Sequence, residues 1–329
     1  MTRKVGTIRD VADRVGLSIA TVSRVMNGAR NVAPATRDKV LEAIRALNYL
    51  PNPAARALST AKSRTVATVI PSIEHSIYAK FMGAVERTLA EQGYSLVFAV
   101  SNGVAEQEHA AVQKLLGMGA EGFILSGQAH GAELTELLDL RRVPYVFTSV
   151  YDPDSAVPTI GYDNHALAAE AVRFLRGEGH ERIAVLHGPL DTNDRARARL
   201  AGARSAAPVA AFEGALDVAG GKQAARAALA EANRPTALLC FSDVLALGAC
   251  FALAEAGLSV PGEMSVMGFD NLDWTSELVP PLTTMNLPAR KMGQEAARQL
   301  VERLETGVPL ASARFDGTII TRGSVAPPR

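Results

Sequence analysis

The sequence predicts an α/β protein in which an all-α head of three short helices precedes a body of two doubly wound parallel sheets. Helical patterns fill the first fifty residues, whereas short apolar runs alternate with amphipathic helices from Val66 onward. The charge changes at the same place. Residues 1–62 hold eleven Lys and Arg against four Asp and Glu, and residues 63–329 carry a net charge of −7. A basic head on an acidic body indicates a nucleic-acid-binding module joined to a domain of another kind.

The head begins with a helix whose two ends are marked in the sequence. Thr7 is a favourable N-cap, and apolar residues follow it at helical spacing. Gly16 ends this helix, because a left-handed C′ position favours a residue without a Cβ. Ser18 begins a second helix, and Pro34 begins a third. Two short helices around a Gly-containing turn, with a third that completes the core, predict a helix-turn-helix domain over residues 1–50.

The second helix of such a domain enters the major groove of DNA. Arg24 has the fork geometry that reads a guanine edge, and Ile19 and Ala20 carry apolar groups that can contact thymine methyls. The alternative is that these side chains are only the outer face of a small helical bundle. Four polar residues of this helix are suited to donate to phosphate oxygens: Ser18, Thr21, Ser23 and Asn27.

The body contains two series of apolar runs that are typical of buried parallel strands. The runs are 66–71, 94–100, 122–127 and 145–150, followed by 183–188, 208–214, 237–243 and 264–270. Helices are expected between them near 79–92, 104–116, 131–140, 163–177, 194–205, 220–232 and 243–256. Two such series in tandem predict two lobes with a cleft between them. In open α/β sheets, ligands bind beyond the carboxyl ends of the strands.

Composition and spacing disfavour several classes of protein. No apolar run reaches the roughly 18–20 residues of a membrane helix, and no apolar stretch of a secretory signal follows the charged N-terminus. Cys240 and Cys250 lack zinc spacing and indicate reduced thiols of a cytoplasmic protein. The GxGxxG at 117–122 follows a helix and precedes a strand, the reverse of the dinucleotide-binding context. We expect no enzyme, no metal and no cofactor.

The segment TIRDVADRVGLSIATVSRVMNG, together with the stretch through LNYLPNPAARALST, resembles the DNA-binding head of the lactose-repressor/galactose-repressor (LacI/GalR) family. The likeness continues over essentially the whole chain. It implies that Ile19 and Ala20 are specificity positions and that Arg24 reads a base. The expected DNA-binding residues are Thr7, Ser18, Ile19, Ala20, Thr21, Ser23, Arg24, Asn27, Asn31, Thr36, Ala55 and Leu58.

The resemblance also identifies residues 52–58 as a hinge helix, in which Leu58 wedges into a central base step of the minor groove. An isolated helix of this length is marginal in water. We therefore expect it to fold when two copies pack together over DNA. A plain flexible linker is the alternative, although it does not explain the Ala- and Leu-rich composition of the segment.

The rest of the chain resembles periplasmic sugar-binding proteins, whose chain crosses between two lobes three times. The crossings are expected near 161–163, 286–290 and 315–318. The predicted domains are thus a helix-turn-helix domain (1–50), a hinge helix and linker (51–62), and an effector-binding and dimerisation domain (63–329). The last is divided into lobe N, about 63–162 plus 289–316, and lobe C, about 163–288 plus 317–329.

By the same resemblance, Arg199 anchors the effector and Asp270 is its partner carboxylate across the cleft. A guanidinium donates and a carboxylate accepts hydrogen bonds, which suits a polyhydroxylated ligand. The segment 202–213 is shorter than in the family, and Leu216 takes the place of an aromatic residue. A helix cap is the alternative role for Asp270 and the favoured one for Asp243. The expected effector-binding residues are Ser72, Tyr78, Ser149, Arg199, Leu216, Ser242 and Asp270.

Arg195 and Arg197 add positive charge beside Arg199. They favour an anionic effector or an acid sugar, or they form a solvated helix face.

We therefore expect a sequence-specific DNA-binding transcriptional regulator, a repressor, whose operator affinity is controlled by a small molecule between the lobes. The small molecule is expected to be a sugar or sugar derivative; a co-repressor-dependent regulator that senses a purine or another non-sugar metabolite is the alternative. The expected partners are a near-palindromic double-stranded operator, the effector and a second copy in a homodimer, with a tetramer left open and no membrane. A solute-binding protein is a rival class that would need export, which the sequence does not signal. A nicotinamide-dependent dehydrogenase is another, which the misplaced glycines and the basic head disfavour.

Overall fold

The computed structural model describes residues 6–26, 29, 31–50, 62–73 and 76–329. The chain divides into two units, residues 1–63 and 64–329, and each is considered by itself. Three of the expected DNA contacts, Asn27, Ala55 and Leu58, lie outside the described residues, as does most of the predicted hinge segment. Within the described ranges, every helix is too short or too polar to span a lipid bilayer.

The first unit contains three helices among its described residues: α1 (Ile8–Val15), α2 (Ile19–Met26) and α3 (Pro34–Ala46). Thr7 caps α1 in a capping box, because its hydroxyl accepts from the Asp10 N–H while its own N–H donates to the Asp10 carboxylate. Gly16 follows α1 with a φ of 68°. Valines on the inner faces of the three helices form the core, and this confirms the predicted three-helix head.

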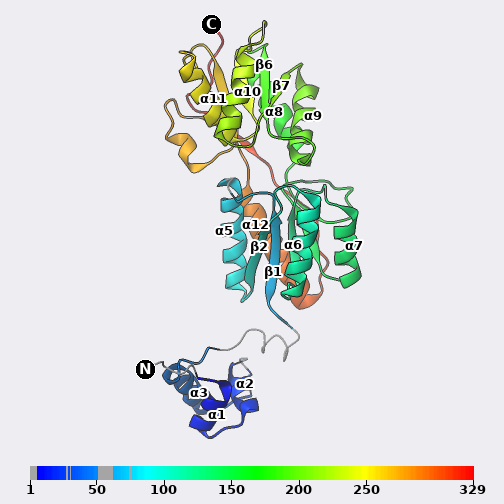
Figure 1. Cartoon of the computed structure of the whole chain (residues 1–329), viewed down its shortest axis with the longest axis vertical. Coiled ribbons are helices and arrows are strands. Elements are labelled where there is room, and N and C mark those ends of the chain that lie inside the picture. Colours follow the sequence, from blue (N-terminus) through cyan, green and yellow to red (C-terminus); the bar gives the residue numbers. More distant parts are fainter. Residues whose placement is uncertain (1–5, 27–28, 30, 51–61, 74–75) are drawn as a thin grey trace. The chain divides into compact units, whose positions relative to one another are not determined.

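Lobe N of the second unit is built on a sheet with the strand order β11-β5-β4-β3-β1-β2. Helices cover both of its faces, and Figure 1 shows α5 and α12 together on one of them. The elements are β1 (Thr65–Ile70), α5 (Ser76–Glu91), β2 (Ser95–Val100), α6 (Ala105–Gly117), β3 (Gly122–Ser126), α7 (Ala132–Arg141), β4 (Tyr145–Thr148), β5 (Thr159–Gly161), α12 (Ala289–Thr306) and β11 (Ala313–Arg314).

Lobe C is built in the same way on a second sheet, with the order β12-β10-β9-β8-β6-β7. It contains α8 (Asn164–Gly177), β6 (Ile183–His187), α9 (Asp194–Ala206), β7 (Ala210–Glu213), α10 (Val218–Leu229), β8 (Ala237–Cys240), α11 (Asp243–Glu255), β9 (Ser265–Asp270), a 3-10 helix (Asp273–Ser276), β10 (Thr283–Asn286) and β12 (Thr318–Ile320). The two layered sheets confirm the predicted α/β class. The chain passes between them after β5, after β10 and after β11.

Two expectations about the sheets are wrong. The runs that became β2 and β7 are not buried on both faces, because these strands are sheet edges, and the Phe98 side chain on β2 is 47% exposed. The sheet of lobe C is also not wholly parallel, since β12 runs antiparallel to β10. β10 runs toward the other lobe before the chain crosses, whereas β12 begins just after the chain has crossed back. The two strands therefore run in opposite directions. Four short strands, β5, β10, β11 and β12, were also missed from sequence.

Candidate functional site

A cavity of about 770 Å³, open solvent at its mouth included, lies between the two lobes. This is within the range of small-molecule sites. Lobe N contributes α5, the end of β4 and α12 to its wall, and lobe C contributes α9 and the residues beyond β6, β8 and β9. Six of the seven expected effector-binding residues line it: Tyr78, Ser149, Arg199, Leu216, Ser242 and Asp270. Ser72 is among the described residues but is not part of this wall.

The Arg199 guanidinium is held in one place by three contacts. Its Nε donates to the Oδ1 of Asn164 at 2.9 Å, and its Nη1 donates to the carbonyl of Phe241 at 2.6 Å. Its central carbon lies 4.7 Å from the centre of the Phe269 ring, a cation–π contact. All these partners are electrically neutral, and the residue is 8% exposed. Arg199 is thus a fixed hydrogen-bond donor in the cavity wall.

Asp270 ends β9 with a φ of 115°, a conformation that L-residues rarely adopt. Its carboxyl group accepts a hydrogen bond from the backbone N–H of Asp243 at the start of α11. Burial and the neighbouring Asp243 carboxyl raise the pKa of Asp270 well above its ordinary value, against the effect of Arg199. The Asp270 carboxyl group in the cavity wall therefore stays protonated to a higher pH than an ordinary aspartate side chain.

Asp243 is the second carboxyl group of this region, and the expectation that it caps α11 is wrong. Ser242 is the N-cap, because its hydroxyl accepts from the Leu245 N–H. The Asp243 carboxylate instead accepts from the Leu272 N–H at 2.8 Å and from the Thr284 hydroxyl at 2.6 Å. Burial raises the pKa of Asp243 to about 7. A Cβ on Gly268 would lie 2.2 Å from its Oδ1, so only glycine leaves room for this side chain.

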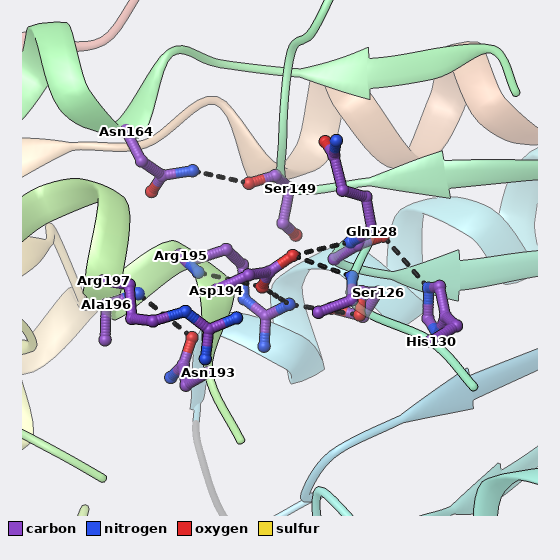
Figure 2. Close-up of polar contacts among 12 residues, drawn as sticks. Ser126, Gln128, His130, Ser149, Asn164, Asn193, Asp194, Arg195, Ala196 and Arg197 are labelled. Atoms are coloured by element: carbon purple, nitrogen blue, oxygen red, sulfur yellow. Dashed lines mark hydrogen bonds and ion pairs between the residues drawn. The ribbon is translucent and has the colours of Figure 1, made fainter. Parts of the chain in front are cut away.

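The first turn of α9 fastens lobe C to lobe N, as Figure 2 shows. The Asp194 Oδ2 accepts from the backbone N–H groups of Gln128 and Ala129, at 2.7 and 3.1 Å. Arg195 donates to the carbonyl of Ser126 and forms an ion pair with Asp194 at 3.0 Å. Burial alone would raise the pKa of Asp194, but Arg195 and the backbone N–H groups outweigh burial and lower the pKa. We call these contacts the α9 clasp.

The loop that the α9 clasp holds is supported from within lobe N. The Nδ1 of His130 lies 2.8 Å from the Glu108 carboxylate, and its Nε2 lies 3.1 Å from the carbonyl of Gly127. The His130 ring thus connects the loop that follows β3 to α6. Gly127 has a φ of 89°, and a Cβ there would lie 2.0 Å from the Arg195 Nη1. Arg195 can therefore reach Ser126 only because residue 127 is glycine.

The two arginines that precede Arg199 have different positions. Arg195 lines the cavity, but its charge is matched by Asp194. Arg197 lies on the exposed side of α9 and donates to the carbonyls of Leu190 and Asp191. The structure thus places Arg197 on the solvated helix face that the sequence left as an alternative.

Several cavity residues were missed from sequence. They come from the apolar side of the wall, and they are Ile77, Phe81, Tyr162, Phe241, Val244 and Met292. Their helical or strand spacing in the sequence predicts only that they are buried, and every core residue shows the same pattern. Asn193 was also missed, although it lies two residues before Arg195 and caps α9.

The head presents the side chains expected for DNA contact. Ile19 is 42% exposed, and Ala20 and Arg24 are also exposed on α2, while Val22 and Val25 of the same helix are buried. Thr21 donates its N–H to the hydroxyl of Ser18, which caps the helix. The remaining described positions are partly or fully accessible: Thr7, Ser23, Asn31 and Thr36.

Comparisons with known proteins agree with this architecture. The family model described as "Bacterial regulatory proteins, lacI family" matches residues 7–52, and that described as "Periplasmic binding protein-like domain" matches residues 172–325. The chain is 32% identical to the HTH-type transcriptional repressor CytR of Escherichia coli K12, over 97% of this chain and 96% of that protein.

Two solved structures extend the comparison. The Lac repressor dimer bound to operator and the anti-inducer ONPF has a TM-score of 0.88 and 29% identity, covering 98% of this chain and 100% of that chain. The complex of the transcriptional regulator CelR with cellobiose has a TM-score of 0.71 and 29% identity, covering 97% and 99%. CytR and Lac repressor are both repressors. With its helical head, its two-lobed body and this likeness over nearly its whole length, the chain belongs to the LacI family of DNA-binding transcriptional regulators.

Proposed function

We propose that the protein is a homodimeric repressor whose operator affinity falls when a neutral, polyhydroxylated molecule, a sugar or sugar derivative, occupies the cavity between the lobes. The observation that carries this proposal is the pairing of a fixed donor, Arg199, with a buried carboxyl group, Asp270, in one cavity wall. Sugar hydroxyl groups both donate and accept, so they satisfy both residues. The apolar side chains around them suit the C–H faces of a sugar ring.

The charge around the cavity favours a neutral molecule over an anion. The Arg195 guanidinium is paired with Asp194. Arg199 lies near the buried Asp270 carboxyl group, whose pKa is raised well above its ordinary value by burial and by the neighbouring Asp243. The Arg195 charge is therefore matched before any effector binds, and Arg199 already contacts three neutral groups. An anionic effector would place a negative charge in the same buried wall as the Asp270 carboxyl group, which is costly.

A purine that acts as co-repressor is the second candidate. The rings of Tyr78, Tyr162 and Phe241 line the same cavity, and a flat base can stack on such rings. The exocyclic and ring nitrogens of a purine would face Arg199 and Asp270. A nucleoside carries both a sugar and a base. A ligand screen distinguishes among sugars, purines and nucleosides.

On the DNA side, we propose that each head reads one half of a near-palindromic operator, with Arg24 on a base edge and Ile19 and Ala20 as the specificity positions. Two hinge segments, 52–58, would pair over the minor groove with Leu58 as the wedge. This rests on the family membership and on the exposed face of α2. A dimer suffices for this function, and it involves no catalysis. Like its relatives, the regulator would act in the cytoplasm.

Effector binding and operator binding are linked because both depend on how the two lobes are arranged. A molecule that bridges Tyr78 of lobe N and Arg199 of lobe C favours one arrangement of the lobes. The hinge segments extend from lobe N, so their pairing on DNA depends on that arrangement. Coupling energies of about 1–3 kcal/mol, or 5–150-fold in affinity, are usual for such linkage.

The test is a thermal-shift screen of the intact protein against sugars, sugar acids, nucleosides and purines. A ligand at 100 times its Kd should stabilise the protein by about 2.7 kcal/mol. The compounds that bind are then added to operator complexes during a salt titration. Stabilisation by neutral sugars with loss of operator affinity supports the proposal. If only purines stabilise the protein and they raise its operator affinity, the effector is instead a purine that acts as co-repressor.

A further inference from the structure

Lys80 of lobe N reaches across to lobe C at the turn that follows β9. Its Nζ donates to the carbonyl of Asn271 at 2.7 Å and forms an ion pair with the Asp273 Oδ1 at 2.8 Å. The Lys80 side chain is 18% exposed, whereas that of Asp273 is 84% exposed. Exposed ion pairs contribute little because water and salt screen them. The sheltered bond to the Asn271 carbonyl is therefore the stronger part of this contact.

The turn that Lys80 contacts, residues 270–273, is conformationally strained. Asp270 has a φ of 115° and Asn271 a φ of 52°, and neither residue is glycine. Such conformations persist only where surrounding contacts hold them. Within lobe C, the Arg322 Nη2 donates to the Asn271 Oδ1 at 2.8 Å, and the Asn271 Nδ2 donates to Asn286 at 3.0 Å. Lys80 adds a contact from the opposite lobe.

This turn begins at Asp270 in the cavity wall. The next residues lead to Leu272, whose N–H donates to Asp243. The Asn271 carbonyl that Lys80 contacts belongs to the same peptide group as this Leu272 N–H, and Asp270 is the residue before Asn271. The ammonium group of Lys80 also favours the ionised forms of both carboxyl groups.

We propose that Lys80 is a positioning residue of the effector site, which holds the turn 270–273 and so sets the place of the Asp270 carboxyl group when the lobes are closed. Its role toward an effector rests on the proposed function. The contact itself can be tested without any effector. If the lobes separate, Lys80 leaves the turn, and Asp270 loses both its support and a nearby positive charge. Lobe closure would thereby prepare the carboxyl group that the effector meets.

The other charged and titratable groups that face the two carboxyl groups come from different elements. Arg199 belongs to α9 and Arg322 to the C-terminal segment, and both lower the pKa of one of the two carboxyl groups. The phenol of Tyr162, after β5, has its own pKa raised by burial and stays neutral. None of these side chains is altered by a substitution at Lys80. The substitution therefore removes one of the positive charges that act on the two carboxyl groups and leaves the others present.

The experiment is an infrared pH titration of the intact, effector-free protein that follows the C=O stretching band of buried protonated carboxyl groups. Asp270→Asn and Asp243→Asn assign the band. Lys80→Met removes the charge and keeps the apolar stem, Lys80→Arg keeps the charge, and Asp273→Asn removes only the exposed partner. The Lys80→Met midpoint should rise by about half a pH unit or more, because a nearby positive charge is lost. Lys80→Arg should titrate like the wild type, and Asp273→Asn should not raise the midpoint.

Quenching of Trp274 by acrylamide follows the position of the turn in the same samples, since this is the only tryptophan in the sequence and lies within the 3-10 helix beside Asp273. Lys80→Met should increase quenching, and Lys80→Arg should not. A Lys80→Met protein with wild-type midpoint and wild-type quenching overturns the proposal, as does an equal rise in Asp273→Asn. If the midpoint and quenching change as expected but no screened compound binds, the proposed effector function fails while the effect of Lys80 on the turn stands.

Discussion

Arg199, in the wall of the cavity, donates from its Nε to the Oδ1 of Asn164 at 2.9 Å. The Nδ2 of the same Asn164 donates to the carbonyl of Ser149 in lobe N at 2.9 Å. The amide orientation is fixed, because a guanidinium only donates and a carbonyl only accepts. Arg199 is therefore connected to lobe N through one side chain. An effector that moves the guanidinium also moves a contact between the lobes.

Asn164→Ala should destabilise the protein by about 1–3 kcal/mol, because it leaves the buried Ser149 carbonyl and the Arg199 Nε without these partners. Urea unfolding followed by Trp274 fluorescence measures the loss. His165→Ala is the matched control, since His165 is the next residue along α8 but is exposed. The control should lie within about 0.5 kcal/mol of the wild type. Equal losses in the two variants would show that Asn164 contributes only through the helix that carries it.

Gly127→Ala should open the α9 clasp. The φ of 89° is unfavourable for alanine, and its Cβ would lie 2.0 Å from the Arg195 Nη1. Arg195 would have to leave the carbonyl of Ser126. We expect a lower unfolding midpoint and weaker effector binding in calorimetry.

Gly117→Ala is the control for this substitution. Gly117 ends α6, and a Cβ there would meet nothing within 4 Å. Alanine is also the better helix former by about 0.5–1 kcal/mol. This variant should be at least as stable as the wild type. A Gly127→Ala protein that unfolds and binds like Gly117→Ala would show that the clasp tolerates the added methyl group.

The elements of the body could be predicted because each apolar run and each helix carries its own periodic pattern. Arg199 and Asp270 could be assigned because a family resemblance places them, and both line the cavity. Lys80 and Asn164 could not be found in this way. A lysine on an amphipathic helix and an asparagine at a helix start are ordinary surface and capping residues. Only the fold shows that each one reaches the opposite lobe.

The short strands were missed for a related reason. β11 and β12 have two and three residues, and their pairing depends on where the chain re-enters each lobe. Such segments have too few residues to show a period of two. The edge strands β2 and β7 were predicted from their apolar residues, but these residues are less buried than the apolar runs indicate. Strand order, which decides burial, is a tertiary property.

The free energy of unfolding of the Asp194→Asn variant should depend less on pH in the acidic range than that of the wild type. The contacts of Asp194 lower its pKa in the folded protein below the value of about 3.9 in the unfolded chain. The stabilisation is therefore fully present above the unfolded pKa and is lost as the pH falls through the folded pKa. At pH 7 the variant should unfold at lower urea concentration than the wild type.

The difference between the two midpoints should shrink as the pH falls below about 4, where the wild-type carboxylate takes up its proton. Urea midpoints across this range measure it. The neighbouring Asp191→Asn is a suitable control, because Asp191 is exposed. A midpoint difference that persists undiminished at the acid end would mean that the Asp194 charge has no part in holding the lobes.

Arg199→Ala should abolish the response of the operator complex to effector and leave operator affinity in the absence of effector unchanged. The substitution removes the fixed donor of the cavity without touching the head. Arg199→Lys should also fail, since one ammonium group cannot reproduce the contacts to both Asn164 and Phe241. Arg197→Ala, on the exposed side of the same helix, should respond normally. A preserved response in Arg199→Ala would place the effector elsewhere.

Arg24→Ala and Arg24→Lys should separate base reading from phosphate attraction in the head. If Arg24 reads a guanine edge, alanine should cost about 1–3 kcal/mol on the cognate operator and relax the preference at one base pair. Lysine keeps the charge but lacks the planar fork, so it should lose part of the base preference while leaving the salt dependence of binding near that of the wild type. Fluorescence anisotropy with operators substituted at single base pairs, repeated over a range of salt concentrations, measures both quantities. A contact to phosphate would instead give unchanged base preference in both variants, with a log–log salt slope reduced by about 0.9 in Arg24→Ala alone.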